Sequence, residues 1–482
     1  MRVAFFASEM IPYIKTGGLA DVIGSLPRAL IHNVDQIDVF IPYYREIERQ
    51  KLPLSTNSFE FKIKIGSRSY KGTTFELKTD YQNLRVFFVD NYHFFRRRSE
   101  LYVKDGRDYH DNLARFIFFC RGALKTTEYL SSMKPYDVFH MHDWQTALVG
   151  IYTELSRFHQ KNPPTRIFTI HNLAYQGKFP RSQFRLLNLD SSYYHFLEFW
   201  GKLSMMKAGI IFSDLITTVS PTYAQEIQTK RFGAGLEELI KQNKSKLYGI
   251  LNGVDYSIWN PENDPYIPST YSINDLSGKL QCKNELQQRY SLTENPEIPI
   301  LGVVSRLAWQ KGMELVLKVI SQLLGENRVQ FVLLGTGDHN LEQKFHELGN
   351  LFPSQTGISL TYNDSLAHQI EAGADIFLMP SRYEPCGLND KYSLRYGTIP
   401  IAFKTGGLSD SIIDYSSNSN KGTGFLFSSY DEGDFRDAIE RALKVFQSKQ
   451  KWVELVQRAM RQDFSWENAA KKYLNLYQKQ KR

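Results

Sequence analysis

The pentapeptide Lys-Thr-Gly-Gly-Leu occurs twice in this chain, at residues 15–19 and again at residues 404–408. Each copy follows an apolar, strand-like run, opens a stretch of helical periodicity, and is followed two residues later by Asp21 or Asp410. A glycine pair at a strand-to-helix turn lets the backbone approach a ligand and directs N–H groups and the helix dipole at an anion. One copy alone is typical of an ordinary turn. Two copies with the same lysine predict two half-sites for an anion.

Between these turns, short apolar runs alternate with segments of helical periodicity, which is the pattern of parallel sheets wrapped by helices. The predicted strands cover residues 3–7, 37–41, 84–89, 138–140, 166–170, 215–219, 300–304, 330–334, 358–361, 376–379 and 399–402. The predicted helices cover residues 19–30, 112–130, 145–155, 202–211, 221–228, 312–323, 341–348, 366–372 and 388–396. A chain of 482 residues is too long for one ordinary core, so we expect two domains, with the boundary just before the Pro- and Asn-rich stretch 260–276.

Composition narrows the class of partner. The net charge of +8 is compatible with an acidic partner, but the longest basic run is Arg96-Arg97-Arg98, so we expect no nucleic acid. Three scattered cysteines, Cys120, Cys282 and Cys386, argue against a disulfide framework and suit a reducing compartment. No apolar run is long enough to span a bilayer, and the chain begins directly with a strand. We therefore expect a cytoplasmic protein with no membrane partner.

Residues that follow the predicted strands carry most of the chemistry. In open parallel sheets, ligands bind beyond the carboxyl ends of the strands. The segments at these positions are 15–21, 140–144, 171–172, 252–255, 305–307, 335–338, 382–387 and 404–407.

Two of these segments resemble other kinds of site. His140, His142 and Asp143 have the spacing of a metal site, but such residues more often hydrogen-bond a ligand or cap a helix, and no complementary cluster appears elsewhere. We therefore expect no metal. Residues 335–340 begin like a dinucleotide-binding fingerprint, but Asn340 replaces the third glycine, so this signal is weak.

Charged residues after two later strands suit an anionic ligand. Arg306 directly follows a strand and Lys311 opens the next helix, so both cations would stand beside an anion at a helix N-terminus, although a solvated helix face is the ordinary interpretation. Glu384 either caps the helix that begins near Gly387 or holds sugar hydroxyls or a developing positive charge. Cys386 has no histidine beside it in the sequence, so we do not expect it to be a nucleophile.

Taken together, the motifs resemble bacterial glycogen synthase and plant starch synthase, in consistent order from the first strand to the last helix. The motifs that carry this resemblance are residues 15–22, 142–144, 171–177, 219–223, 251–255, 305–307 with 310–312, and 381–388. The resemblance implies an α/β fold of the GT-B glycosyltransferase type, with two Rossmann-like domains facing a central cleft. The implied segments are 1–250 as the acceptor-side domain, 251–464 as the donor-side domain, and 465–482 as a helix, near Trp466 to Gln480, that crosses back to the first domain.

The same resemblance implies a reaction and its residues. Glucose would pass from ADP-glucose to the non-reducing end of an α-1,4-glucan with retention of configuration, without a metal or other cofactor. Lys15, Arg306, Lys311, Asp143, His171 and Glu384 would be catalytic, the first three at the donor phosphates and the next two in the glucosyl pocket. The implied substrate-binding positions are Lys15, Gly17, Gly18, Asp21, Asn252, Tyr362 beside adenine, Cys386, Gly387 and Leu388 at the glucose hydroxyls, and Thr405 and Gly406 at the phosphates.

The chain departs from the family pattern directly after Leu388. Family members usually carry a hydroxyl residue and then Gln, whereas this chain has Asn389-Asp390. Asp390 would repel a diphosphate if it faced one, but would be favoured at a helix N-terminus if it faced away. Tyr392 stands where many related retaining enzymes have a second glutamate, as it does in glycogen synthases. The alternatives are a UDP-glucose-dependent transferase and a catalytically weakened glucan-binding homologue, and the sequence leaves the oligomeric state open.

Overall fold

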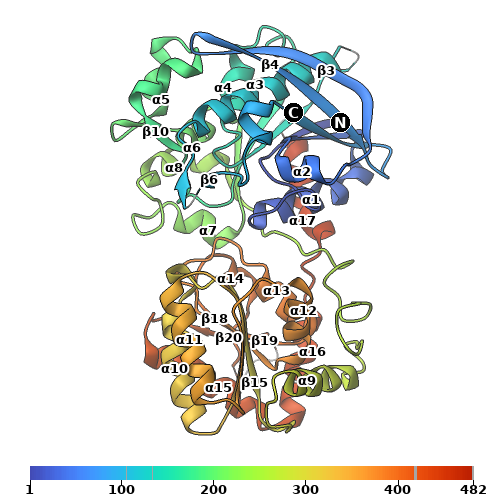
Figure 1. Ribbon diagram of the computed structural model, residues 1–482, viewed down its shortest axis with the longest axis vertical. Helices are drawn as coiled ribbons and strands as arrows, with labels where there is room; N and C mark the ends of the chain where they lie inside the picture. The colour runs from blue at the N-terminus through green and yellow to red at the C-terminus, as the bar shows by residue number, and fades with distance from the viewer. Residues whose placement is uncertain (105, 133, 417–420, 480–482) are drawn as a thin grey trace. The chain divides into compact units, whose positions relative to one another are not determined.

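The computed structural model describes residues 1–104, 106–132, 134–416 and 421–479. The chain divides into two compact units, each shown in Figure 1. Unit 1 comprises Met1–Gly253 together with Trp466–Arg482, and unit 2 comprises Val254–Ser465. The end of the predicted last segment, residues 480–482, lies outside the described residues.

Unit 1 is built on a nine-stranded sheet with the order β14-β13-β9-β8-β1-β2-β5-β4-β3. Its parallel strands are β1 (Arg2–Phe6), β2 (Gln36–Pro42), β5 (Leu84–Asp90), β8 (Val138–His142), β9 (Thr165–Ile170), β13 (Leu215–Thr218) and β14 (Leu247–Gly249). All five residues of β1 are buried, as expected for a parallel strand covered on both faces. The strand order reverses between β1 and β8, and ligands bind at such switch points.

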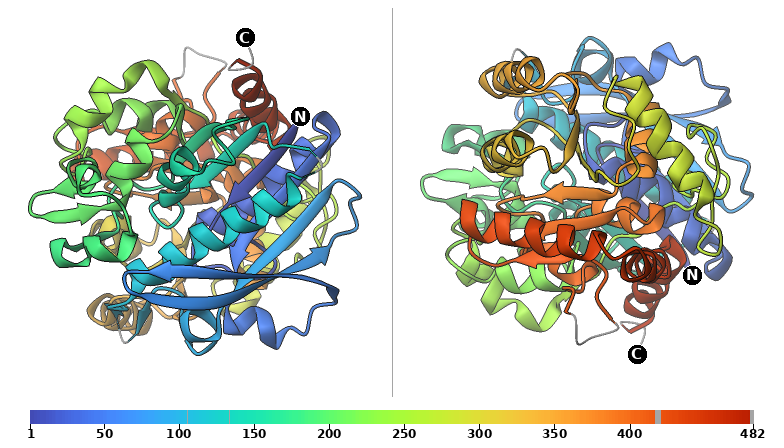
Figure 2. Two further views of the ribbon diagram at one scale, coloured as in Figure 1. Left: turned by 90° about the horizontal axis from the view of Figure 1, so that it is seen from above. Right: turned by 90° about the horizontal axis from the view of Figure 1, so that it is seen from below.

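An antiparallel hairpin extends this sheet. It consists of β3 (Leu54–Ile65) and β4 (Arg68–Lys78), and β4 pairs with β5. Helix α3 (Asn112–Leu130) packs along the hairpin, as the left view of Figure 2 shows. The remaining elements of unit 1 are α1 (Gly18–Leu30), α2 (Arg45–Arg49), β6 (Val103–Lys104), β7 (Arg107–Asp108), α4 (Leu148–Leu155), β10 (Lys178–Pro180), α5 (Tyr194–Leu197), β11 (Glu198–Phe199), β12 (Lys202–Ser204), α6 (Met205–Ile211), α7 (Pro221–Glu226), α8 (Glu237–Gln242) and α17 (Trp466–Lys479). Of these, α17 packs on α1.

Unit 2 contains a six-stranded sheet in which every neighbouring pair is parallel. In spatial order its strands are β17 (Thr356–Ser359), β16 (Gln330–Leu334), β15 (Ile300–Val304), β18 (Ile376–Met379), β19 (Ile399–Phe403) and β20 (Phe425–Phe427). The order reverses between β15 and β18, so these two strands flank the switch point of this unit.

Helices cover both faces of the unit 2 sheet. In Figure 1, α10 (Met313–Gly325) and α11 (His339–Leu351) lie on one face, while α9 (Ser277–Arg289) and α12 (Asp364–Gly373) lie on the other. The other helices are α13 (Asn389–Tyr396), α14 (Gly406–Ser411), α15 (Glu432–Phe446) and α16 (Lys449–Met460). One sheet is entirely parallel, the other is parallel apart from its β3–β4 hairpin, and both are wrapped by helices, which confirms the α/β fold class predicted from the sequence. No helix in the described ranges is long and apolar enough to cross a membrane.

The structure corrects two predicted helices. Residues 202–204 form strand β12, which pairs with β10 and β11, and the helix begins only at Met205, where Ser204 Oγ accepts the N–H of Lys207 at 3.3 Å. The serine cap thus sets the helix start three residues later than the apolar pattern indicated. The helix expected from residue 145 begins at Leu148.

Candidate active site

The first glycine turn lies at the carboxyl end of β1 and is open to solvent. Residues 15–18 are exposed, and Lys15 Nζ lies 2.8 Å from Asp21 Oδ1. A Cβ built on Gly17 would meet no atom within 4 Å. Because the protein does not fill this space, the turn can approach a ligand, and Lys15 and Asp21 already neutralise each other beside it.

Glu9 holds this turn in place and was not predicted from the sequence. The carboxylate is 3% exposed and accepts the hydroxyl of Thr16 at 2.6 Å, the backbone N–H of Thr16, and the hydroxyl of Tyr102 at 2.5 Å. A buried carboxylate needs this number of donors to offset its lost hydration. Its position shortly after β1 was the available signal, since strand ends are where site residues gather.

Asp143 and His171 follow the neighbouring strands β8 and β9 and contact each other. Asp143 Oδ1 accepts the backbone N–H of His171 at 2.8 Å, and Asp143 has a left-handed backbone with φ of 57°. Burial raises the pKa of Asp143 to about 7, although hydrogen bonds from the backbone of His171 and Asn172 oppose the shift. The structure therefore brings together two predicted residues at the carboxyl ends of β8 and β9, beside the switch point of unit 1.

Three histidines surround this point as neutral hydrogen-bonding groups. His142 Nδ1 lies 3.0 Å from His171 Nε2, and burial lowers the pKa of His171 to about 3. Both nitrogens of His140 are occupied within the protein, by the hydroxyl of Tyr477 at 2.8 Å and that of Thr169 at 2.6 Å. Among the described residues, no group of three or more His, Cys, Asp or Glu side chains is placed to hold a metal ion.

Asn252 stands apart from these contacts. It is 5% exposed, and in the described part of the chain its side-chain Oδ1 has no hydrogen-bond partner although it is buried. A buried acceptor without a donor is costly, and a ligand hydroxyl would satisfy it. This observation is compatible with the predicted role of Asn252 in binding a sugar.

Unit 2 forms a pocket of about 200 Å³ at its own switch point. The pocket brings together five predicted site residues from the ends of β15 and β18, namely Arg306, Lys311, Glu384, Gly387 and Leu388. Lys311 Nζ lies 2.5 Å from Glu384 Oε2, and Ser381 Oγ donates to the same oxygen at 3.0 Å. Arg306 is exposed, so its guanidinium can meet an anion at the pocket.

The second glycine turn differs from the first in its surroundings. Residues 405–408 are buried, and a Cβ on Gly406 or Gly407 would lie 2.0 Å from Glu384 O or 1.8 Å from Cys386 O. These glycines are required because the backbone of the Glu384–Cys386 loop packs directly against them. Thr405 and Gly406 are not among the residues that line the unit 2 pocket. The two identical pentapeptides therefore meet different physical demands.

Two more predicted residues do not line this pocket. Cys386 is 8% exposed and belongs to the Glu384–Cys386 loop, and Tyr362, between β17 and α12, is 78% exposed. Asn389, which was noted in the sequence only as a departure from the family, does line the pocket and donates its amide to Val304 O at 2.7 Å.

The structure decides between the two orientations considered for Asp390. Its side chain is completely buried, lies 3.0 Å from Lys391 Nζ, accepts the hydroxyl of Ser411, and does not line the pocket. Asp390 therefore faces the protein interior, and its charge is compensated there.

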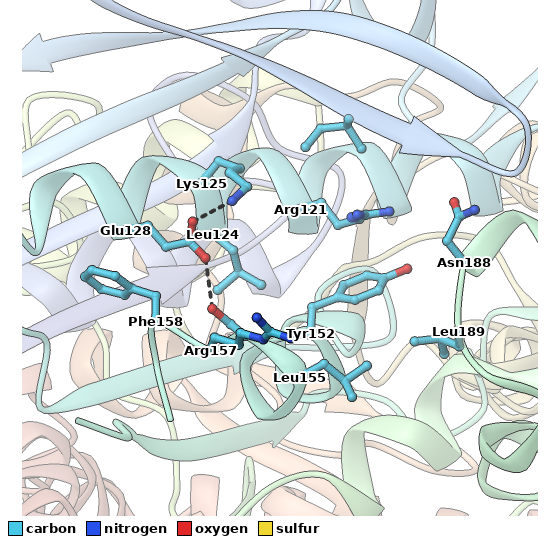
Figure 3. A pocket seen from close by; sticks show the side chains of 12 residues that line it. Arg121, Leu124, Lys125, Glu128, Tyr152, Leu155, Arg157, Phe158, Asn188 and Leu189 are labelled. Carbon is cyan, nitrogen blue, oxygen red and sulfur yellow. Dashed lines mark hydrogen bonds and ion pairs between the residues drawn. The ribbon is translucent and has the colours of Figure 1, made fainter. Parts of the chain in front are cut away.

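A hollow of about 410 Å³ on unit 1 contains none of the predicted site residues. It lies between α3 and α4, and Figure 3 shows its lining. Two of its three basic side chains already have acceptors: Arg121 donates to Lys64 O at 2.6 Å, and Lys125 pairs with Glu128 at 2.7 Å, and Arg157 is the third. We assign this hollow no part in the site.

Two Rossmann-like units with charged strand ends at their switch points define the GT-B class of glycosyltransferases. Residues 2–242 match the starch synthase catalytic domain, and residues 284–458 match the glycosyl transferases group 1 family. Glycogen synthase from Koribacter versatilis is 41% identical, with 100% of this chain and 98% of the relative covered. Glycogen synthase from Thioalkalivibrio sulfidiphilus is 42% identical, with 99% of each covered.

A solved structure shows the same similarity to the starch synthases. The catalytic domain of starch synthase IV from Arabidopsis thaliana, bound to ADP and acarbose, superimposes with a TM-score of 0.88 at 34% identity over 99% of this chain and 98% of that one. The chain belongs to the glycogen and starch synthase family and is a retaining hexosyltransferase.

Proposed function

We propose that this enzyme transfers glucose from ADP-glucose to the non-reducing end of an α-1,4-glucan with retention of configuration. The observation that carries the proposal is the unit 2 pocket, where Arg306, Lys311 and Glu384 meet at the switch point. The names of the relatives and the ADP and acarbose bound to starch synthase IV support the choice of donor and acceptor.

The chemistry requires stabilisation of a departing diphosphate. Cleavage of the glycosyl–phosphate bond leaves positive charge on the sugar ring and concentrates negative charge on ADP. Arg306 and Lys311 supply two cations, and the N-terminus of α13 borders the same pocket through Leu388 and Asn389. Fixed cations and N–H donors of this kind are the largest contributors in many enzymes because they need no reorganisation.

Glu384 exchanges partners when the donor binds. In the donor-free enzyme its carboxylate neutralises Lys311 at 2.5 Å. A diphosphate competes for that ammonium, and the carboxylate becomes available to the hydroxyls of glucose. On unit 1, the Lys15–Asp21 pair at 2.8 Å offers the same exchange beside the open glycine turn.

Asp143, His171 and Asn252 serve the glucosyl group. A neutral imidazole and an unsatisfied amide oxygen bind hydroxyls without repelling the positive charge that develops on the sugar ring. Retaining hydrolases use a carboxylate pair flanking the bond, and we assign no such pair. The leaving phosphate instead helps to deprotonate the acceptor hydroxyl on the same face. No metal takes part in this scheme, because Arg306 and Lys311 carry the charge that Mg²⁺ carries elsewhere.

The weakened-homologue alternative rested on Asn389-Asp390. Since Asp390 is buried beside Lys391 and does not line the pocket, it does not bring the expected like-charge repulsion. The departure from the family pattern is therefore compatible with full donor binding.

One assay tests the proposal and separates the alternatives. Purified enzyme is incubated with glycogen and radiolabelled ADP-glucose or UDP-glucose, and the label in polymer is counted and then released with an α-specific glucosidase. We expect α-linked label from ADP-glucose. Incorporation of label from UDP-glucose alone would show that UDP-glucose, not ADP-glucose, is the donor. Glycogen binding without incorporation from either donor would identify a non-catalytic homologue.

A further inference from the structure

A buried ion pair lies behind the loop that borders the unit 2 pocket. Lys391 and Asp390 are both completely buried, and Lys391 Nζ lies 3.0 Å from Asp390 Oδ2. The same ammonium donates to two backbone carbonyls of the loop, Gly387 O at 2.9 Å and Cys386 O at 3.3 Å. Each of its three N–H groups therefore has an acceptor.

The two carbonyls belong to peptide units that also carry the N–H groups of Gly387 and Leu388. Both residues line the pocket, whereas Lys391 does not. In a trans peptide the C=O and N–H bonds point in opposite directions, so a cation that holds both oxygens behind the loop turns both N–H groups the other way. A cation on the oxygen also polarises the peptide and strengthens the N–H as a donor. Within the described ranges, neither N–H donates to another protein group.

Stability alone does not account for this pair. Apolar residues of similar volume usually stabilise a core as well as a buried ion pair does. Burial tends to lower the pKa of Lys391, but the attraction of Asp390 and of the nearby Cys386 and Glu384 side chains outweighs it, and the net shift is upward. The lysine therefore stays charged behind the loop.

We propose that Lys391, with Asp390 as its counter-ion, is a positioning residue that aims the N–H groups of Gly387 and Leu388 at the glucosyl hydroxyls of the donor. The proposal rests on the proposed function, because it needs a sugar nucleotide in the unit 2 pocket. Asp390, one of the two residues that depart from the family pattern, then helps to hold the loop that carries Gly387 and Leu388.

A matched pair of double variants of the full chain tests this role. Asp390→Asn/Lys391→Met removes the ion pair under study. Asp375→Asn/Lys283→Met removes a similar buried pair, with Nζ and Oδ2 2.9 Å apart and Lys283 also donating to Pro296 O at 2.7 Å. The control pair lies at the amino end of β18, whereas the site lies beyond its carboxyl end.

We expect the Lys391 variant to lose about 10- to 100-fold in kcat/KM for ADP-glucose, with the KM for glycogen unchanged. This loss is smaller than the roughly 10²- to 10³-fold cost of removing one preorganised donor outright, because the two N–H groups are misaimed rather than removed. The Lys283 variant should keep donor kinetics within about twofold while its melting temperature changes comparably. Donor kcat/KM within about threefold of the parent for the Lys391 variant, or an equal loss in the control, would overturn the proposal.

Calorimetry gives a readout that does not depend on turnover. Because the aimed N–H groups bind the sugar, the Lys391 variant should lose the preference for ADP-glucose over ADP and keep its affinity for ADP. If the Lys391 variant keeps the parent's preference for ADP-glucose over ADP, the proposal is overturned. If the parent enzyme binds only UDP-glucose, the proposed donor is wrong, and the same comparison is then made with UDP-glucose and UDP. If the methionine variant does not fold, Asp390→Asn/Lys391→Gln retains an N–H donor to the carbonyls and should show a smaller loss of the same preference.

Discussion

At the scale of single residues, the unit 2 cations are expected to dominate catalysis. Arg306→Ala or Lys311→Ala should lower kcat by about 10²- to 10³-fold, the usual cost of one preorganised electrostatic group. Lys318→Ala is a suitable control, because this lysine lies on α10, is well exposed and pairs with Glu432 at 2.5 Å outside the pocket. Steady-state kinetics with ADP-glucose and glycogen measure the difference. Activity of either site variant within a few-fold of the parent would contradict the assignment.

Asp143 makes stability depend on pH. Its pKa is about 7 in the folded chain against an ordinary value of 3.8, so the folded state holds a proton that the unfolded chain releases between these values. Stability therefore falls as pH rises through this window and stays lower above it. Asp143→Asn cannot ionise, and its stability relative to the parent should improve by about 3 kcal/mol between pH 5 and pH 8. Thermal unfolding at both pH values measures this change, and an equal difference at both would show that Asp143 ionises normally.

At the scale of elements, the two glycine turns should respond differently to the same substitution. Gly407→Ala places a Cβ 1.8 Å from Cys386 O, so it should displace the Glu384–Cys386 loop and lower both the melting temperature and the activity. Gly17→Ala meets no protein atom within 4 Å and has an extended backbone, so it should fold normally and lose donor kcat/KM by about 10-fold or more if substrate occupies that space. A Gly17 variant with full activity would mean that the open space is not used.

Helix α17 reaches the histidine cluster of unit 1 through one hydroxyl. Tyr477 is fully buried, and its hydroxyl lies 2.8 Å from His140 Nδ1. Tyr477→Phe leaves that nitrogen without a partner and should cost about 1–3 kcal/mol. Tyr44→Phe is the matched control, because the Tyr44 hydroxyl is buried and has no hydrogen-bond partner in the described part of the chain, so its removal should be neutral or stabilising. Thermal unfolding of both variants measures these changes in stability, and equal changes would contradict the role of this hydrogen bond.

The sequence predicted the strands that end at a candidate site better than the elements that do not. Strands such as β15 and β18 were predicted because they are continuous apolar runs followed by charged residues. The β3–β4 hairpin was missed, although Phe59, Phe61, Ile63 and Ile65 alternate with polar residues, because no chemistry follows it. Glu9 and Lys391 were missed for another reason: their importance comes from tertiary hydrogen bonds to a turn and a loop, which no local pattern encodes.

At the scale of the whole molecule, the chain enters and leaves unit 2 at one place. Val254 pairs with Ser465 at the boundary of unit 2, and in unit 1 a Cβ on Gly253 would lie 2.6 Å from Trp466 Cα. Unit 2 is thus a continuous segment with adjacent ends, inserted into unit 1. Domains of this kind can often be excised, since few backbone contacts cross their boundaries.

Separate production of the two units should therefore yield two folded proteins. Residues 254–465 form their own sheet and core, and they carry Arg306, Lys311 and Glu384, so this fragment should unfold cooperatively and bind ADP with an affinity within about tenfold of the full chain. Residues 1–253 joined by a short glycine–serine link to residues 466–482 should also fold, whereas residues 1–253 alone lack the buried face of α17 and should not. Circular dichroism melts and calorimetry with ADP check each part, and neither part should transfer glucose. An excised unit 2 that folds but does not bind ADP, while the intact chain does, would show that the unit 2 cations are insufficient to hold the diphosphate.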